Sequence, residues 1–190
     1  MKKIGICGGI GSGKSVVSRI LKNFGFAVYD SDSSAKQLMR SNLSIRTALI
    51  ERFGYEIYDG ENLNKPLLSQ RIFSNKQDRF FVNQVVHPIV AADFLQWSAQ
   101  QKHEMVFIES AILSESSITQ LLDASIFVEA PQEVRVERVI QRNHCSKEDA
   151  LARVFTQNVE QDKKNCRFII QNDNKTLVTK QLLSILKDLT

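Results

Sequence analysis

Residues 8–15 combine residue types and a spacing that can bind phosphate. They read Gly-Gly-Ile-Gly-Ser-Gly-Lys-Ser, which satisfies the pattern G-x-x-x-x-G-K-[ST] with Lys14 and Ser15 at its end. Glycines let backbone N–H groups converge on phosphate oxygens, and the N-terminus of a following helix adds partial positive charge. We therefore expect Lys14 to reach the β- and γ-phosphates of a nucleotide, and the Ser15 hydroxyl to bind Mg²⁺. The residues expected to bind the nucleotide are Gly8, Gly9, Gly11, Ser12, Gly13, Lys14, Ser15 and Val16.

Acidic residues follow two of the apolar segments of the chain. Asp30 and Asp32 come after residues 26–29, and Glu109 ends residues 104–109. A carboxylate beside the γ-phosphate can orient an acceptor hydroxyl and accept its proton, which is the role open to Asp32. A helix N-cap is an equally good interpretation of Asp32, and Asp30 is the competing acid. Glu109 occupies the place of an acid that supports Mg²⁺ through water, although aspartate is usual there.

Three arginines recur along the segment after Pro131. At about 100° per residue, Arg135, Arg138 and Arg142 share one narrow face of a helix. Arg138 and Arg142 are candidates for a mobile lid that clamps the transferring phosphoryl oxygens. A solvated helix face, paired with neighbouring glutamates, is the alternative. His87 could contact an anionic substrate, or it could be packed at a break between helices.

Short apolar segments predict the strands that must position these residues. The segments are 2–7, 26–29, 104–109, 124–129 and 167–170. Helical segments separate them, which is typical of an α/β fold with a doubly wound, mainly parallel sheet of five strands. Ligands bind beyond the carboxyl ends of the strands in such sheets. The glycine loop and the three acids all lie at that edge.

Periodicity predicts several helices, and residues 55–66 are expected to form a loop around Asp59-Gly60. The predicted helices are 16–24, 33–40, 43–53, 67–73, 77–86, 89–101, 147–158 and 175–189, with one more that begins at Pro131. We expect one domain over residues 1–190, with its core in 1–32, 104–130 and 165–190. The connection between the second and third strands is far longer than one crossover helix needs, so residues 33–103 are predicted to form a helical insertion that binds the substrate. Proline lacks the N–H that a helix interior uses, so we expect a break at Pro88. Residues 131–164, which carry the arginines, are predicted to form a helical lid.

Composition restricts the classes of partner. The net charge is +4 and the lysines and arginines are dispersed, which argues against a dedicated nucleic-acid binder. The three cysteines have no metal-ligand spacing and fit a reducing compartment. No apolar run approaches the ~20 residues that cross a bilayer, and the first residues lack a signal-peptide core. We expect a cytoplasmic protein without nucleic-acid or membrane partners, and we favour a monomer.

Taken together, the motifs closely resemble those of the dephospho-CoA kinase family. The similarity runs from Ile4 to about Asn172, and it rests on the glycine loop in combination with later motifs at matching separations. Those later motifs are Asp30-Ser-Asp32, Val86-His-Pro88, Glu129-Ala-Pro131, Glu137-Arg138-Val-Ile-Gln-Arg142, Ala150-Leu-Ala-Arg153 through Gln157, and Phe168-Ile-Ile-Gln-Asn172.

The resemblance implies transfer of the ATP γ-phosphoryl group to the ribose 3′-hydroxyl of dephospho-CoA with Mg²⁺, the last step of coenzyme A synthesis. It implies that Asp32 is the catalytic base, that Lys14, Arg138 and Arg142 neutralise developing charge, and that His87 lies in the helical part that binds CoA. The alternative is a kinase of the same fold for another small acceptor, such as a nucleoside monophosphate or a hydroxylated metabolite.

The chain departs from the family pattern after the third strand. Where the family usually shows Asp-x-Pro-Leu-Leu-x-Glu, this chain has Glu109-Ser-Ala-Ile-Leu-Ser-Glu115. The exchange at Glu109 alters the acid expected beside the metal, and Ala111 takes the place of proline. Val16 also replaces the threonine or serine that often follows the serine of the glycine loop.

Overall fold

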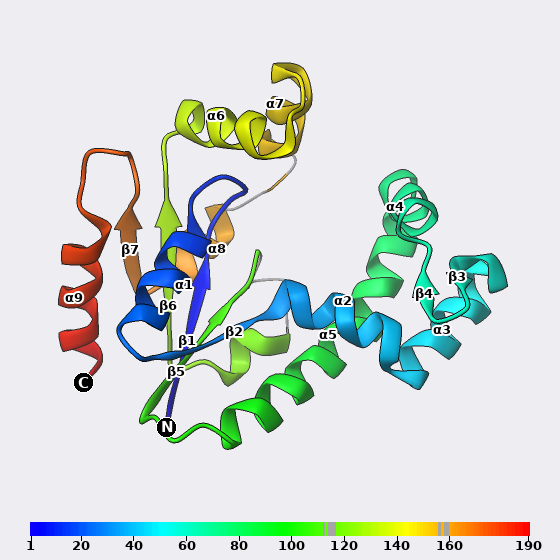
Figure 1. Cartoon of the computed structure of the whole chain (residues 1–190), viewed down its shortest axis with the longest axis horizontal. Helices are drawn as coiled ribbons and strands as arrows, with labels where there is room; N and C mark the ends of the chain where they lie inside the picture. Colours follow the sequence, from blue (N-terminus) through cyan, green and yellow to red (C-terminus); the bar gives the residue numbers. More distant parts are fainter. Residues whose placement is uncertain (112, 114–116, 156, 158–159) are drawn as a thin grey trace. The chain divides into compact units, whose positions relative to one another are not determined.

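Five strands form one parallel sheet in the computed structural model, which describes residues 1–111, 113, 117–155, 157 and 160–190. The strands are β1 (Lys2–Cys7), β2 (Ala27–Asp30), β5 (Met105–Glu109), β6 (Ala124–Glu129) and β7 (Phe168–Gln171). They lie in the order β2-β5-β1-β6-β7 (Figure 1), and each neighbouring pair is parallel. The predicted α/β fold with a parallel five-stranded sheet is therefore confirmed.

The chain forms two compact units. The first consists of Met1–Asp30 and Gln101–Thr190, and the second of Ser31–Gln100. Besides the sheet, the first unit contains α1 (Lys14–Asn23), the 3₁₀ helix η2 (Ser117–Leu121), α6 (Gln132–Asn143), α7 (Lys147–Phe155), α8 (Glu160–Asn165) and α9 (Val178–Leu189).

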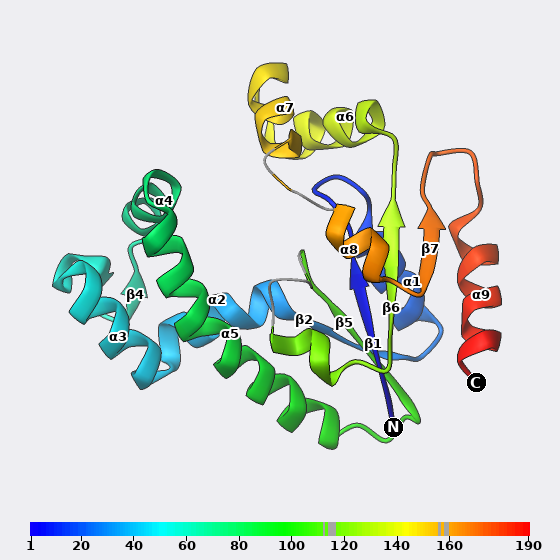
Figure 2. The ribbon, with the colours of Figure 1, turned by 180° about the vertical axis from the view of Figure 1, so that it is seen from behind.

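The core of the first unit lies between the sheet and two helices. Ile4 and Ile6 of β1 are fully buried and pack with Val17 and Leu21 of α1 and with Leu182 of α9. Full burial of each such side chain stabilises the fold by about 1.5–3 kcal/mol. The short helix α8 lies on the other face of the sheet, beside β6 (Figures 1 and 2). Cover on both faces explains why the strands are apolar runs rather than alternating patterns.

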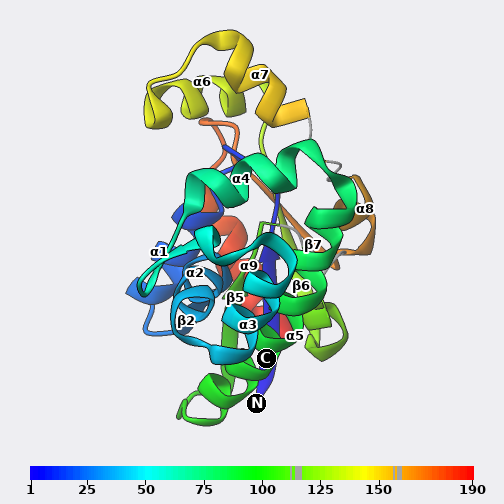
Figure 3. The ribbon, with the colours of Figure 1, turned by 90° about the vertical axis from the view of Figure 1, so that its right-hand side faces the viewer.

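The second unit is mainly helical. It contains α2 (Ser31–Ser41), α3 (Leu43–Phe53), α4 (Lys65–Ser74) and α5 (Lys76–Ala99), shown in Figure 3. Between α3 and α4 lie the 3₁₀ helix η1 (Tyr55–Ile57) and a short antiparallel hairpin of β3 (Tyr58–Asp59) and β4 (Asn62–Leu63). The side chains of Asn42, Asn64 and Asn75 accept hydrogen bonds of 2.8–3.4 Å from the first turns of α3, α4 and α5. These caps let one residue separate consecutive helices or a strand from a helix.

The break expected at Pro88 is wrong, because α5 continues from Lys76 to Ala99 with the proline inside it. An interior proline removes one backbone hydrogen bond and costs about 3 kcal/mol. Buried apolar residues recur at four-residue spacing on both sides of the proline: Val82, Val86, Val90 and Phe94. Packing of this continuous stripe holds the helix together through the proline.

Several elements differ from the sequence expectations. The helix α8 was not expected, and the loop predicted around Asp59-Gly60 contains the β3–β4 hairpin. The helix predicted over 147–158 is observed as far as Phe155, while positions 156 and 158 lie outside the described residues. The last helix begins at Val178 rather than at residue 175. Across the described ranges, no helix is both long and apolar enough to cross a membrane.

Candidate active site

The glycine loop connects the carboxyl end of β1 to the N-terminus of α1. Gly13 caps α1 in the left-handed conformation, with φ +94°, and its carbonyl accepts hydrogen bonds from the N–H groups of Val16 and Val17. The N–H of Ser12 donates to the carbonyl of Gly9 at 3.0 Å. The strand, loop and helix predicted around residues 8–15 are thus present.

Close packing leaves no room for a side chain at two of the loop glycines. A Cβ at Gly13 would lie 2.1 Å from Nδ2 of Asn172, and one at Gly9 would lie 2.2 Å from Nη2 of Arg135. The Asn172 amide occupies this space because it donates to the Ser12 carbonyl at 2.7 Å. The loop therefore touches residues from two distant parts of the chain, the start of α6 and the end of β7.

Lys14 lies against the loop that it follows. Its Nζ donates to the Gly8 carbonyl at 2.8 Å and approaches the Gly9 carbonyl at 3.5 Å. A lysine ammonium has several donors on a flexible stem, so it can exchange these carbonyl oxygens for phosphate oxygens.

Arg138 of α6 contacts the loop directly. Its Nη1 donates to the carbonyls of Gly11 and Ser12, both at 3.2 Å, and its Nη2 donates to the Asn172 carbonyl at 3.2 Å. Arg142 is exposed, and its Nε donates to Asn143 Oδ1 at 3.2 Å. Of the two predicted arginines, the structure brings Arg138 to the loop and leaves Arg142 one turn of helix further along.

Arg135 contacts the loop although it was not among the predicted site residues. Its Nε donates to the Ile10 carbonyl at 2.9 Å, and within the described residues its buried Nη2 has no hydrogen-bond partner. Burial lowers the pKa of its guanidinium from the ordinary value. A buried cationic donor beside a phosphate-binding loop is suited to an anionic ligand. The sequence could have indicated Arg135 as a site residue, because it shares the helix face of Arg138 and is closer to β6.

A cavity of about 380 Å³ adjoins the loop. Gly9, Ser12 and Arg135 line it together with Glu129 and Lys163. Glu129 pairs with Lys163 and accepts a hydrogen bond of 2.6 Å from Gln171. The hydrogen bond from Lys163 is the main reason why the pKa of Glu129 is lowered, although burial opposes it.

Two acids meet at the carboxyl edge of the sheet. Asp30 and Glu109 are paired in register as the last residues of β2 and β5, and Glu109 is half-buried. Ser15 lies in the first turn of α1 with an exposed side chain. Across the described ranges, no group of three or more His, Cys, Asp or Glu side chains is arranged to hold a metal. The oxygen donors that are present suit Mg²⁺, which is bound by few protein ligands and keeps water and phosphate oxygens.

Asp32 and His87 belong to the helical unit. Asp32 is the second residue of α2 and is exposed, and it follows the last residue of β2 by two positions. His87 is half-buried in the middle of α5. Asp32 therefore lies inside the first turn of α2 rather than at the N-cap position that its alternative interpretation expected, and its role toward a substrate stays a prediction.

Two thiols lie side by side at the end of β1. Cys7, the last residue of β1, is fully buried, and its Sγ lies 3.4 Å from the Sγ of Cys166. Both are free thiols. The hydrogen bond to Cys166 and burial raise the pKa of the Cys7 thiol, so Cys7 is a packed, protonated side chain rather than a nucleophile.

Comparisons with known proteins agree on one family. The family model described as dephospho-CoA kinase (CoaE) matches residues 2–177. A dephospho-CoA kinase of Bacteroides fragilis is 38% identical over 97% of this chain and 91% of its own length. The enzyme of Porphyromonas gingivalis is 41% identical over 85% of this chain and 80% of its own length.

Solved structures share the fold. The crystal structure of TT1252 from Thermus thermophilus superposes with a TM-score of 0.85 at 30% identity, covering 100% of this chain and 98% of that chain. Dephospho-CoA kinase from Campylobacter jejuni superposes with a TM-score of 0.71 at 23% identity, with coverage of 100% and 98%. At 23% identity, the similarity to the Campylobacter jejuni structure shows a shared fold alone.

Proposed function

The chain belongs to the dephospho-CoA kinase family, whose reaction is the last step of coenzyme A biosynthesis, and we propose that its glycine loop presents ATP to the ribose 3′-hydroxyl of dephospho-CoA. The observation that carries this proposal is the convergence of Lys14, Arg138 and Arg135 on the loop backbone. A glycine loop at a helix N-terminus binds phosphate, and cations beside it stabilise the charge of a transferring phosphoryl group.

Each basic residue has a defined task in this proposal. Lys14 exchanges the carbonyls of Gly8 and Gly9 for the β- and γ-phosphate oxygens of ATP. Arg138 and Arg135 neutralise charge that develops on the transferred group. The Arg142 guanidinium donates to Asn143 and does not contact the loop in this structure. Arg142 joins the other two arginines at the transferred group when the lid closes.

The acidic and hydroxyl groups complete the site. Asp32 orients the 3′-hydroxyl of dephospho-CoA and accepts its proton. Ser15, with Glu109 acting through water, would hold Mg²⁺, which neutralises phosphate charge when bound. His87 and the rest of the helical unit bind dephospho-CoA. We also propose that the functional unit is a monomer.

Replacement of Asp32 tests the base assignment. Asp32→Asn keeps the size of the side chain and removes its capacity to accept a proton, so we expect kcat to fall by about 10²–10⁴. The affinity for ATP should stay within about threefold, because phosphate binding depends on the loop. ADP release, coupled to NADH oxidation, measures the rate with dephospho-CoA.

The matched control is Glu51→Gln, which neutralises an exposed carboxylate on α3 of the same unit. This control should keep the wild-type rate. If Asp32→Asn also turns over at the wild-type rate, Asp32 is not the base. The same assay with AMP and shikimate in place of dephospho-CoA checks the acceptor, and faster turnover of either would contradict dephospho-CoA as the substrate.

A further inference from the structure

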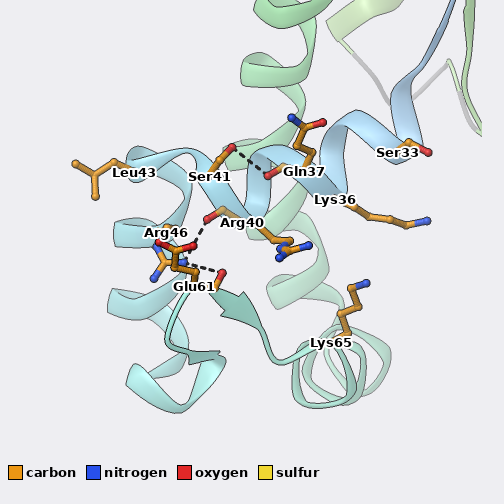
Figure 4. Close-up of a pocket in the computed structure, with 9 residues that line it drawn as sticks. All are labelled: Ser33, Lys36, Gln37, Arg40, Ser41, Leu43, Arg46, Glu61 and Lys65. Carbon is orange, nitrogen blue, oxygen red and sulfur yellow. Dashed lines mark hydrogen bonds between the residues drawn. The ribbon is translucent and has the colours of Figure 1, made fainter.

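A basic cavity lies within the helical unit. Its volume is about 840 Å³, and it is lined by side chains of α2, α3, α4 and the β3–β4 hairpin (Figure 4). The lining residues are Ser33, Lys36, Gln37, Arg40, Ser41, Leu43, Arg46, Glu61 and Lys65. Figure 4 shows Arg40 on α2 and Lys65 on α4 reaching into the space between these helices. A volume of this size suits one small molecule rather than a macromolecular surface.

The charge of this cavity is unbalanced. Lys36, Arg40, Arg46 and Lys65 contribute four cations, and Glu61 is the one acid among the lining residues. In the part of the chain that the structure describes, none of these cations forms an ion pair with Asp or Glu. Cations gathered without acidic partners repel one another, and a bound anion relieves that repulsion.

Hydrogen bonds to neutral groups hold two of the cations in place. The Arg46 guanidinium donates to the carbonyls of Gly60 at 2.9 Å and Glu61 at 3.2 Å, and it lies 4.2 Å from the centre of the Tyr58 ring. Arg40 donates to Asn62 Oδ1 at 2.9 Å. These bonds leave the positive charge uncompensated while they fix its position, so the cavity is organised for an anion before the anion binds.

We propose that this cavity binds the diphosphate of dephospho-CoA. The proposal rests on the proposed function, and it adds the subsite that recognises the part of the substrate that does not react. Residues 32, 36 and 40 follow one another at four-residue spacing along α2, so Asp32, Lys36 and Arg40 form one ridge of the helix. Lys36 and Arg40 lie about 6 and 12 Å along the helix from Asp32. This separation matches a substrate whose reactive 3′-hydroxyl and diphosphate are attached to the same ribose.

The anchored diphosphate explains how the acceptor is positioned. When Lys36, Arg40 and Lys65 hold the diphosphate, the ribose extends along α2 toward Asp32. Binding energy from the diphosphate then orients the 3′-hydroxyl, which does not itself bind strongly. The cavity is thus a specificity site that discriminates dephospho-CoA from acceptors without a diphosphate.

The test compares the Michaelis constants of charge-neutral variants. Lys36→Gln and Arg40→Gln should each raise the KM for dephospho-CoA about 5- to 10-fold, and the double variant about 30-fold or more. The KM for ATP should stay within about twofold of the wild-type value, since ATP binds on the glycine loop. Lys76→Gln, which neutralises an exposed cation on α5 outside the cavity, is the matched control and should change neither constant.

Two further variants separate charge from structure. Arg40→Lys keeps the charge, so we expect its KM for dephospho-CoA to lie within about threefold of the wild type. Glu61→Gln removes the one acid of the lining, so its KM should fall about twofold, which damage to the fold would not produce. The KM of the wild type should rise with ionic strength, and this dependence should weaken in the double variant.

The outcomes distinguish this proposal from the proposed function. If the wild type phosphorylates dephospho-CoA while the double variant keeps the wild-type KM, the cavity does not bind the diphosphate and the kinase assignment stands. If the wild type does not phosphorylate dephospho-CoA, the proposed function itself fails. Equal increases in the KM for ATP and for dephospho-CoA would also overturn the subsite, because they would indicate a general loss of structure.

Discussion

Replacement of Gly13 by alanine should damage the phosphate-binding loop in a way that the structure lets us estimate. Gly13 has φ +94°, where an L-residue costs about 1–2 kcal/mol. The new Cβ would lie 2.1 Å from Nδ2 of Asn172, a buried side chain that is 8% exposed. Displacing this amide breaks its hydrogen bond to the Ser12 carbonyl, which contributes about 0.5–1.5 kcal/mol. We expect the free energy of unfolding to fall by about 2–4 kcal/mol in total.

Gly25 supplies a matched control for this estimate. Its φ is +90°, nearly that of Gly13, but a Cβ there would meet no atom within 4 Å. Gly25→Ala should therefore lose only the backbone contribution of about 1–2 kcal/mol. Urea denaturation of the two variants, followed by circular dichroism, measures the difference, and titration with ATP should show weaker binding for Gly13→Ala alone. Equal losses of stability in both variants would refute the reasoning, because the contact with Asn172 would then contribute nothing.

The remaining predictions concern the arginines of α6 and the Glu129–Lys163 ion pair. Arg138→Ala removes the hydrogen bonds to the loop carbonyls, so it should destabilise the ligand-free protein by about 1–2 kcal/mol in urea denaturation. Arg142→Ala should change the stability by less than about 0.5 kcal/mol, because within the described residues Arg142 bonds only to Asn143. A larger loss of stability for Arg142→Ala than for Arg138→Ala would contradict the observed contacts. The hydrogen bond from Lys163 lowers the pKa of Glu129 in the folded state, so this carboxylate stabilises the fold above its unfolded pKa, and the stabilisation is lost as the pH falls through the folded pKa. The difference in unfolding free energy between wild type and Glu129→Gln should be below about 1 kcal/mol near neutral pH, because the Glu129–Lys163 pair is partly exposed. The difference should vanish in acid, where Glu129 is protonated. A difference independent of pH would show that the charge of Glu129 does not contribute to stability.

The strands of the sheet were predictable from the sequence because each is a short apolar run. Residues 104–109 illustrate this, since four consecutive positions of β5, from Met105 to Ile108, are buried. The order of the strands was not predictable from such runs, because the choice of neighbours depends on how the connections pack. The helix through Pro88 shows a different limit. Proline removes one local hydrogen bond, but packing of the buried stripe on both sides outweighs that loss, so a local rule predicts the wrong boundary.

The candidate site was partly predictable for similar reasons. The spacing of residues 8–15 is enough to predict a glycine loop between a strand and a helix, with Lys14 at the start of the helix. Which arginine of α6 reaches the loop depends on where α6 begins relative to β6, and periodicity alone does not give this position. Arg135 and Arg138 lie in the half of α6 nearer to β6, and they contact the loop. The contact of Asn172 with the loop and the basic cavity of the helical unit were not predictable from spacing, because the residues involved come together only through tertiary packing.

The central position of β1 in the sheet has a consequence for synthesis of the protein. β1 is the first strand of the chain, yet its two partners begin at Met105 and Ala124. Pairing across such separations is slow, because a long loop must be closed before any contact forms. The glycine loop also depends on Arg138 and on Asn172, which lies close to the C-terminus. A nascent chain therefore completes the contacts of its glycine loop only after Asn172 has left the ribosome, and a chain that ends before Asn172 lacks the hydrogen bond that packs the loop.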